Sequence, residues 1–146
     1  MNKTMEMALR LLTRREHSQQ ELTQKLLKKF SEEDVAPVIS KCCQLGLVDN
    51  QRFLESRIRH RVQQGYGPEW IKQDLYPHQI EEELLSQFMN FDEGFWVEQA
   101  TNLVIRKYKT RDVKVEKPKI QRYLYQRGYP VAVIQQAMKT ILSHDD

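Results

Sequence analysis

The chain has 146 residues, of which 40% are hydrophobic and 29% charged, and its formal net charge is +3. This balance is typical of a globular protein and excludes a disordered chain. No apolar run approaches the roughly 18 residues of a membrane-spanning helix, and no signal-type segment stands at the N-terminus. The sequence therefore predicts a cytoplasmic protein with no membrane partner.

The first third of the chain is predicted to hold three helices. Apolar residues at helical spacing place the first helix over residues 4–15. Ser18, followed three residues later by Glu21, is a capping box that opens the second helix, and Ser31 opens the third in the same way. Gly46 stands where a helix commonly ends in the left-handed conformation.

The third of these helices carries a proline and two adjacent cysteines. Pro37 lies inside it, which predicts a kink or a delayed helix start. Cys42 and Cys43 cannot form an ordinary disulfide framework. A strained disulfide between neighbours is the alternative, but both cysteines are interpreted as small apolar helix residues, since no histidine pattern suggests an activated thiol.

The middle third repeats this plan. Asp49 is a good N-cap for a helix that runs to about residue 64. Pro68 occupies the first turn of the next helix, because proline is tolerated where the backbone N–H has no helical partner. Pro77 marks the turn before an acidic helix around residues 81–89.

The last third begins near Asp92, and its first helix extends to about Tyr108. Pro118 and Pro130 open two further helices. The stretch TRDVKVEK, residues 110–117, is an insertion between the first helix and the one that Pro118 opens, and it is predicted to be an exposed loop, because its alternating pattern is short and highly charged.

An internal period of 49 residues relates the three parts. Five apolar columns recur in three copies without a gap, and they are Leu22, Ile71 and Ile120; Leu26, Leu75 and Leu124; Val35, Leu84 and Val133; Ala36, Leu85 and Ile134; and Ile39, Phe88 and Ala137. Such self-similarity is typical of stacked helical repeats. The predicted fold is all-α, with three tandem three-helix repeats (about nine helices) in an elongated, curved arrangement. The predicted repeat boundaries are 1–48, 49–91 and 92–146.

The sequence offers no catalytic or metal site. Four histidines lie among polar neighbours without the spacing of metal ligands and are predicted to be surface or turn residues: His17, His60, His78 and His144. Three consecutive glutamates, residues 81–83, sit at a helix start, where negative charge stabilises the helix dipole. We therefore expect no enzyme activity and no cofactor.

The stretch RHRVQQGYGPEW contains two glycines beside a tyrosine in a basic setting. A phosphate-binding loop would need a preceding strand and a complete glycine motif, and this stretch has neither. Gly65, Tyr66, Gly67 and Pro68 are instead predicted to form an interhelical joint, in which a left-handed glycine ends one helix and the next begins. Gly128 starts a similar joint in the last repeat.

Charge is segregated along the chain. Residues 73–105 carry seven carboxylates and no Lys or Arg, whereas residues 101–127 carry nine basic residues against two acidic ones. Basic residues interleaved with tyrosines suit contact with phosphates or with an acidic protein groove, although solvated helix faces would give the same pattern. The candidate filament or DNA contact residues are Arg57, Arg59, Arg61, Lys72, Arg106, Lys107, Lys109, Lys119 and Arg122.

Four stretches together resemble the RecX family, regulators of the bacterial RecA recombinase. They are ALRLLTRREHSQQELTQKL, LGLVDNQRFLES, RHRVQQGYGPEWIKQDL and IQRYLYQRGYP, and they follow one another in family order over essentially the whole chain. The segment joining LGLVDNQRF to GYGP is the most specific. The family's usual glycine after the second helix is present only as Gly128, with Phe30 and Gln79 in its place in the other repeats.

The resemblance implies three three-helix repeats and a non-enzymatic protein that lies in the groove of the RecA nucleoprotein filament. Members of this family dampen ATP hydrolysis, strand exchange and filament growth, and many bind DNA. For this chain the implied partners are therefore the RecA filament and single- or double-stranded DNA without sequence preference. The alternative is a free-standing DNA-binding helical protein that competes for DNA. Nothing in the sequence requires more than a monomer.

Overall fold

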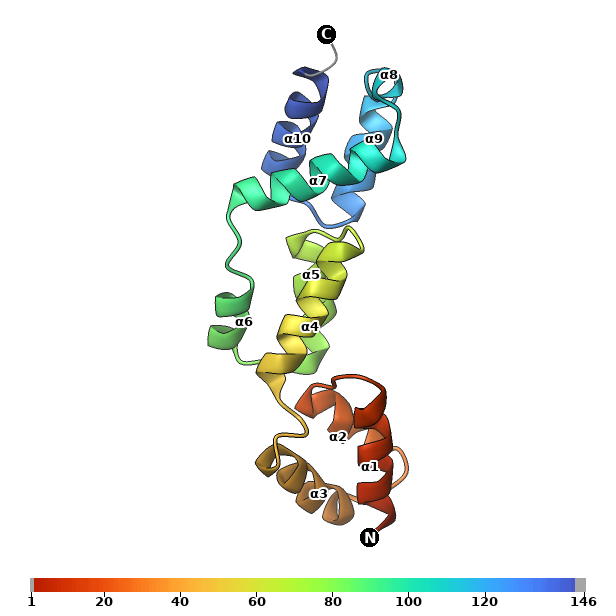
Figure 1. Cartoon of the computed structure of the whole chain (residues 1–146), viewed down its shortest axis with the longest axis vertical. Coiled ribbons are helices and arrows are strands. Elements are labelled where there is room, and N and C mark those ends of the chain that lie inside the picture. Colours follow the sequence, from red (N-terminus) through yellow and green to blue (C-terminus); the bar gives the residue numbers. More distant parts are fainter. Residues whose placement is uncertain (1, 144–146) are drawn as a thin grey trace. The chain divides into compact units, whose positions relative to one another are not determined.

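The computed structural model describes residues 2–143, and those residues are helical with short connections. The first part of the chain forms α1 (Lys3–Arg14), α2 (Gln19–Leu27) and α3 (Glu32–Gln44). The middle part forms α4 (Asn50–Gln63), α5 (Pro68–Leu75), the 3-10 helix η1 (Tyr76–His78) and α6 (Glu82–Phe88). The last part forms α7 (Glu93–Lys107), α8 (Thr110–Val113), α9 (Lys117–Gln126) and α10 (Val131–Ser143) (Figure 1).

Short polar side chains begin the helices, as the sequence predicts. The side chains of Ser18 and Ser31 accept hydrogen bonds from backbone N–H groups three residues on, and Asp49 does the same for α4. The capping box at Ser18 is completed differently from the expected form. Glu21, which would bond back to the Ser18 backbone, instead holds the guanidinium of Arg15 at 2.5 Å, because an ionic partner binds a carboxylate more strongly than a neutral amide does.

Helix α3 runs without interruption through Pro37, and it begins at Glu32 directly after its serine cap. The expected delayed start is therefore wrong, since the proline falls beyond the first turn and the cap fixes the helix start before it. Cys42 is buried, Cys43 is exposed, and both are free thiols.

Two of the five repeated apolar columns are buried in every repeat and belong to its core, whereas Ala36 in the fourth column is exposed. The column of Leu22, Ile71 and Ile120 is completely buried. In the column of Leu26, Leu75 and Leu124, no side chain is more than 1% exposed. These residues lie on α2, α5 and α9, the second helix of each repeat. The residues of these two columns, which recur every 49 positions, therefore occupy the same packing position in each of the three repeats.

The third helix of the middle repeat departs from this plan. Helix α6 has 7 residues and buries none of them, whereas α3 and α10 have 13 residues each. Leu84 and Leu85 are only half-buried. In the connection before α6, Gln79 takes the left-handed conformation with a φ of 52°, at the position where the last repeat has Gly128.

The insertion in the last repeat is not the exposed loop that the sequence predicts. It contains the one-turn helix α8, whose Val113 is only 1% exposed, and α8 contacts α10. Val115, two residues later, is 82% exposed. One apolar side chain is enough to anchor the insertion, because burying it removes its apolar surface from water.

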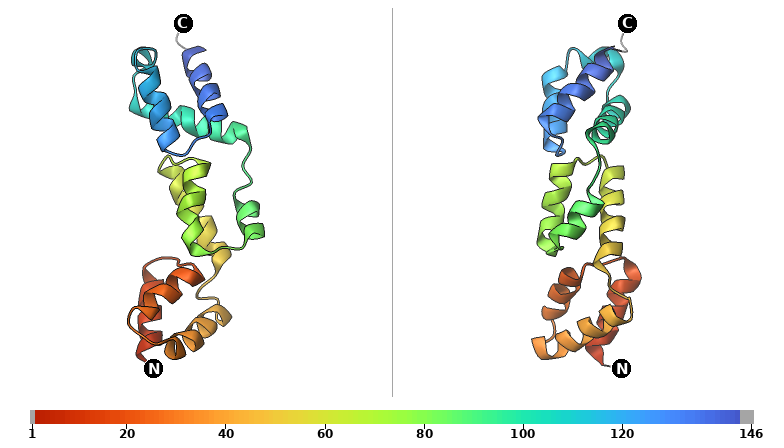
Figure 2. Two further views of the ribbon diagram at one scale, coloured as in Figure 1. Left: turned by 180° about the vertical axis from the view of Figure 1, so that it is seen from behind. Right: turned by 90° about the vertical axis from the view of Figure 1, so that its left-hand side faces the viewer.

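The chain forms two compact units. Unit 1 contains the residues up to Arg57 together with Tyr76–Phe88, and unit 2 contains Ile58–Leu75 together with the chain from Met89 onward. In unit 1, α1 lies against α2 and α3 around a common core. In unit 2, α7 runs across α9 and α10, as the views of Figure 2 show.

Two of the histidines predicted to be surface or turn residues lie in connections but are buried in unit 1: His17 between α1 and α2, and His78 at the end of η1. His17 donates from Nδ1 to the backbone oxygen of Arg15 at 3.0 Å, which leaves Nε2 to accept from the ammonium of Lys25, also at 3.0 Å. His78 is buried with its Nδ1 2.7 Å from Oγ of Ser18. The partners of His17 are near it in sequence, whereas the partner of His78 is 60 residues away and is supplied by the fold. His60 is exposed, and His144 lies outside the described residues.

Candidate functional site

All the predicted contact residues except Arg57 belong to unit 2. Seven of them are exposed, and these are Arg59, Lys72, Arg106, Lys107, Lys109, Lys119 and Arg122. Arg57 and Arg61 are half-buried. Unit 2 therefore carries a set of exposed cations on α4, α5, α7 and α9, available to a negatively charged partner.

Arg61 is fixed within unit 2. Its Nε lies 3.0 Å from Asp74 Oδ2, and the two side chains are 18% and 14% exposed. The guanidinium also donates to the side chain of Gln64 at 2.7 Å and stands 5.2 Å from the ring centroid of Trp70. Because these contacts join the end of α4 to α5, the first role of Arg61 is structural.

The other candidates differ in how strongly they are held. Arg57 has its guanidinium 5.9 Å from the ring of Phe53 on the preceding turn. Lys72 makes an exposed ion pair with Glu69 at 3.6 Å, a type of contact that contributes little to stability. Lys107 places its ammonium 3.8 Å from the ring centroid of Tyr123. Its charge remains exposed, so it can stack on the tyrosine and still reach a partner.

The Gly-Tyr-Gly-Pro stretch forms the predicted joint. The N–H of Gly65 bonds to the carbonyl of Val62 and the N–H of Tyr66 to that of Arg61, the two bonds of a Schellman motif. Pro68 then begins α5. Residues 64–67 therefore connect the end of α4 to the start of α5.

This joint also docks on a second joint far along the chain. The N–H of Gly67 donates to the carbonyl of Arg127 at 2.7 Å, and the N–H of Glu69 donates to that of Gly128 at 3.0 Å. A Cβ at position 67 would lie 2.6 Å from the carbonyl carbon of Gly128, and one at position 128 would clash with the backbone of Trp70. Gly67 and Gly128 are glycines because two backbones meet there.

A ladder of rings and cations lies beside this contact. The guanidinium of Arg127 stands 3.8 Å from the ring centroid of Tyr66, and Tyr66 stacks on Trp70 at 3.6 Å with an interplanar angle of 11°. The other end of the ladder reaches Arg61, whose guanidinium is 5.2 Å from the Trp70 ring. The cation at each end is attracted to the adjacent aromatic face through the ring quadrupole. The ladder therefore ties α4, α5 and α9 together.

Arg127 and Tyr129 complete the joint, and neither was among the predicted site residues. Arg127 donates to the carbonyl oxygens of Gln64 and Gly65, and the hydroxyl of Tyr129 donates to that of Gly65 at 3.0 Å. Burial raises the pKa of Tyr129 to about 12. The sequence signal that could have found them is the near-repetition of Gly-Tyr-Gly-Pro by Arg127-Gly-Tyr-Pro.

The described residues offer little chemistry beyond binding. They contain no group of three or more His, Cys, Asp or Glu placed to hold a metal ion. Burial raises the pKa of the Cys42 and Cys43 thiols, which keeps both protonated and weakly nucleophilic at neutral pH. None of the described helices is both long and apolar enough to cross a membrane.

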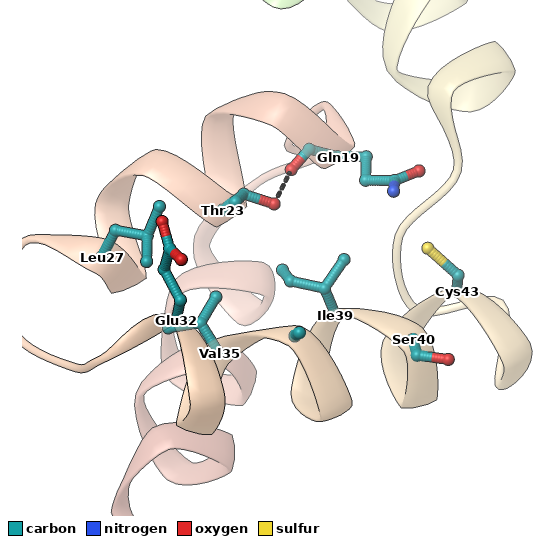
Figure 3. Close-up of a pocket in the computed structure, with 9 residues that line it drawn as sticks. Gln19, Thr23, Leu27, Glu32, Val35, Ile39, Ser40 and Cys43 are labelled. Atoms are coloured by element: carbon teal, nitrogen blue, oxygen red, sulfur yellow. Dashed lines mark hydrogen bonds between the residues drawn. The ribbon is translucent and has the colours of Figure 1, made fainter.

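Unit 1 has an open groove between α2 and α3, shown in Figure 3. Its volume is about 730 Å³, and Leu27, Val35 and Ile39 supply its apolar wall. Thr23 turns its hydroxyl back to the carbonyl of Gln19 at 2.8 Å, so the polar side of the groove is partly satisfied within α2. Glu32 is the charged residue among those described in its lining.

Three tandem three-helix repeats, with exposed cations on α4, α5, α7 and α9, are the architecture of a helical-repeat protein. Three family models match consecutive parts of the chain: the first three-helix domain of RecX over residues 5–42, the second over 49–89 and the third over 97–138. The chain therefore belongs to the RecX family. The predicted fold of three tandem three-helix repeats is confirmed, with η1 and α8 as additions to it.

Relatives and solved structures agree with this assignment. The chain is 39% identical to the regulatory protein RecX of Legionella pneumophila strain Corby, over 98% of this chain and 97% of that one. It is 34% identical to the regulatory protein RecX of Vibrio campbellii, over 91% and 88%. The crystal structure of RecX from Lactobacillus salivarius superimposes with a TM-score of 0.77 at 20% identity, covering 95% of this chain and 94% of that one. Membership of this family makes the chain a regulatory protein rather than an enzyme.

Proposed function

We propose that this chain regulates RecA by lying in the groove of the RecA–DNA filament, where it inhibits ATP hydrolysis, strand exchange and filament extension. Family membership supports RecA as the partner. The observation that carries the rest is the set of exposed cations on unit 2, because a nucleoprotein filament presents a negatively charged surface. The protein acts as a monomer in the cytoplasm and also binds DNA without sequence preference.

The mechanism is occupancy. A chain of helical repeats bridges neighbouring filament subunits and obstructs the movements that accompany turnover. Contact spread over several helices needs no single dominant anchor. The joint of Gly67 on Gly128 supports this mechanism, since it holds α4, α5 and α9 in fixed positions within unit 2 and so fixes the spacing of their cations.

The test is RecA ATPase activity on preformed filaments with saturating DNA. Lys119→Glu with Arg122→Glu reverses two exposed charges on α9, and it should raise the half-inhibitory concentration roughly tenfold. Lys28→Glu with Lys29→Glu is the matched control, because both lysines are exposed in unit 1 and lie outside the predicted contacts. Arg61→Glu is unsuitable, since it would break the ion pair with Asp74.

The competing function is a DNA-binding protein that removes DNA from RecA without touching the filament. The exposed cations of unit 2 would serve that function equally well. Inhibition that disappears when free DNA is added in excess would establish competition for DNA and reject filament binding. Equal loss of inhibition in the α9 variant and the unit 1 control would reject the choice of surface.

A further inference from the structure

A second open groove lies in unit 2, between α9 and α10. Its volume is about 640 Å³. Two lysines and three glutamines face it above a floor of small and aliphatic side chains, and its lining residues are Lys117, Gln121, Ala132, Gln135, Gln136, Met138, Lys139, Leu142 and Ser143. There is no carboxylate among these described residues. The lining therefore combines positive charge with amide groups that both donate and accept hydrogen bonds.

The α9 side of this groove continues into an exposed aromatic residue. Lys117 and Gln121 are one helical turn apart, and Tyr125 is the next residue on the same stripe. Tyr125 is 65% exposed. The core of unit 2 does not account for it, whereas Tyr129 on the following connection is buried. Tyr125, two helical turns from Lys117 along α9, offers a flat face to a ligand.

The first repeat shows that the fold does not require this chemistry. Residues 98 apart correspond in the two repeats, and its groove between α2 and α3 shares three lining positions with this one: Gln19 with Lys117, Thr23 with Gln121 and Ser40 with Met138. Gln19, Thr23 and Leu27 stand where the last repeat has Lys117, Gln121 and Tyr125. The groove of unit 1 is thus apolar with one glutamate, and the groove of unit 2 is cationic. On the third helix the two grooves use different faces, since the equivalents of Val35 and Ile39 are the buried residues Val133 and Ala137.

We propose that the groove between α9 and α10 binds single-stranded nucleic acid. Lys117 and Lys139 neutralise phosphates, the glutamine amides bond to base edges, and Tyr125 stacks on a base. An acidic peptide would pair with the two lysines, but its carboxylates would not stack on the Tyr125 ring or accept the full set of hydrogen bonds that the three glutamine amides offer. Stacking and amide contacts tolerate any base, so the groove has little sequence preference. This inference rests on the DNA-binding part of the proposed function, and it assigns that binding to residues outside the predicted contact set.

The experiment measures fluorescence anisotropy of a labelled oligothymidylate of about 16 nucleotides with the full chain, over a range of salt concentrations. Tyr125→Leu should weaken binding about tenfold, because one stacked base is lost, and Tyr125→Phe should restore affinity to within about twofold. Lys117→Gln with Lys139→Gln should lower the slope of log affinity against log salt by about 1.4, the value for two phosphate contacts on a single strand.

The matched control is Lys28→Gln with Lys29→Gln, which removes the same charge from exposed positions of unit 1 and should leave both affinity and slope unchanged. The proposal is overturned if wild-type protein does not bind the oligothymidylate. It is also overturned if Tyr125→Leu binds like wild type, or if the groove lysines and the control lysines change the slope equally. An oligoglutamate peptide that binds through Lys117 and Lys139, while the oligothymidylate does not depend on them, would assign the groove to an acidic protein segment instead.

RecA ATPase inhibition, measured on the same variants, separates this inference from the proposed function. A wild-type chain that binds the oligothymidylate through Tyr125 but does not inhibit RecA would reject the proposed regulation and keep the groove. The opposite result is a chain that inhibits RecA while the groove substitutions leave its oligothymidylate affinity unchanged. That result would keep the proposed regulation and reject the groove as the nucleic-acid site.

Discussion

Two joints with the same local backbone have different roles in this protein. After α3, Gly46 adopts a φ of +72°, and after α9, Gly128 adopts a φ of +97°. Both close a Schellman motif, with the N–H of Leu47 bonded to Cys42 in one and that of Tyr129 bonded to Leu124 in the other. A Cβ at position 46 would meet nothing within 4 Å, whereas a Cβ at position 128 would strike Trp70. The first joint only turns the chain, and the second is also a packing surface.

The comparison teaches that glycine serves two separate physical needs here. At Gly46 the need is conformational, because residues with a side chain rarely adopt positive φ. At Gly67 the need is purely one of space, since its φ is not positive and its neighbour is the backbone of Gly128. Gly128 combines both. Substitutions at Gly46 and Gly67 can therefore measure the conformational need and the need for space separately.

The largest expected effect comes from alanine at the docked joint. Gly67→Ala should lower the free energy of unfolding by about 3 kcal/mol, because the added methyl group meets rigid backbone rather than a movable side chain. Gly46→Ala should cost only about 1 kcal/mol, from backbone conformation alone. Urea denaturation followed by far-ultraviolet circular dichroism measures both. Equal losses of unfolding free energy in Gly67→Ala and Gly46→Ala would show that the backbone packed against Gly67 adds nothing to the cost of the methyl group.

A smaller effect is expected from the ladder that only the second joint has. Arg127→Met keeps the aliphatic stem but removes the bonds to Gln64 and Gly65 and the stacking on Tyr66, which should cost about 2 kcal/mol. Arg127→Lys should recover only part of this, because an ammonium lacks the planar fork. Arg59→Met is the control, since Arg59 is exposed. A loss in Arg59→Met as large as in Arg127→Met would contradict a special role for the ladder.

The smallest expected effect is the response of unit 1 to acid. Burial lowers the pKa of His17 from its ordinary 6.5, and Lys25 lowers it further, against the opposing charge of Glu21. Because the folded state holds His17 neutral, its contribution to stability is complete above pH 6.5 and is lost as the pH falls through that value.

The midpoint of urea denaturation should therefore decrease between pH 7.5 and pH 5.5 in the wild type. His17→Gln should flatten this dependence, since the amide does not titrate. Gln135→Ala, at an exposed position of α10 in unit 2, should keep the full dependence. A wild-type slope that survives in His17→Gln would assign the acid response to another group.

Much of the fold could be predicted from short-range patterns. The N-caps at Ser18, Ser31 and Asp49 and the glycine stop at Gly46 depend on bonds spanning two to five residues, so a local sequence pattern specifies them. The period of 49 exposes the shared core in the same way, because each repeat buries the same face of its second helix.

Two of the predictions that failed depended on distant partners. His78 stands among polar neighbours in the sequence, yet the fold buries it and it meets Ser18 across 60 residues of chain. Val113 anchors an insertion whose charge suggests a loop. In both cases a tertiary contact outweighs the local pattern, since burial or a hydrogen bond is worth more than a propensity.

The amino-acid order alone thus specified where helices start and stop, how often the unit repeats and which residues face its core, since bonds between near neighbours and the spacing of apolar side chains set all of these. Only the tertiary structure decided that Gly67 and Gly128 touch and that Arg127 locks them. It also decided that the groove of unit 2 combines lysines and glutamines from α9 and α10. Those arrangements pair groups on separate helices, and a pair of this kind exists only once packing has brought the helices together.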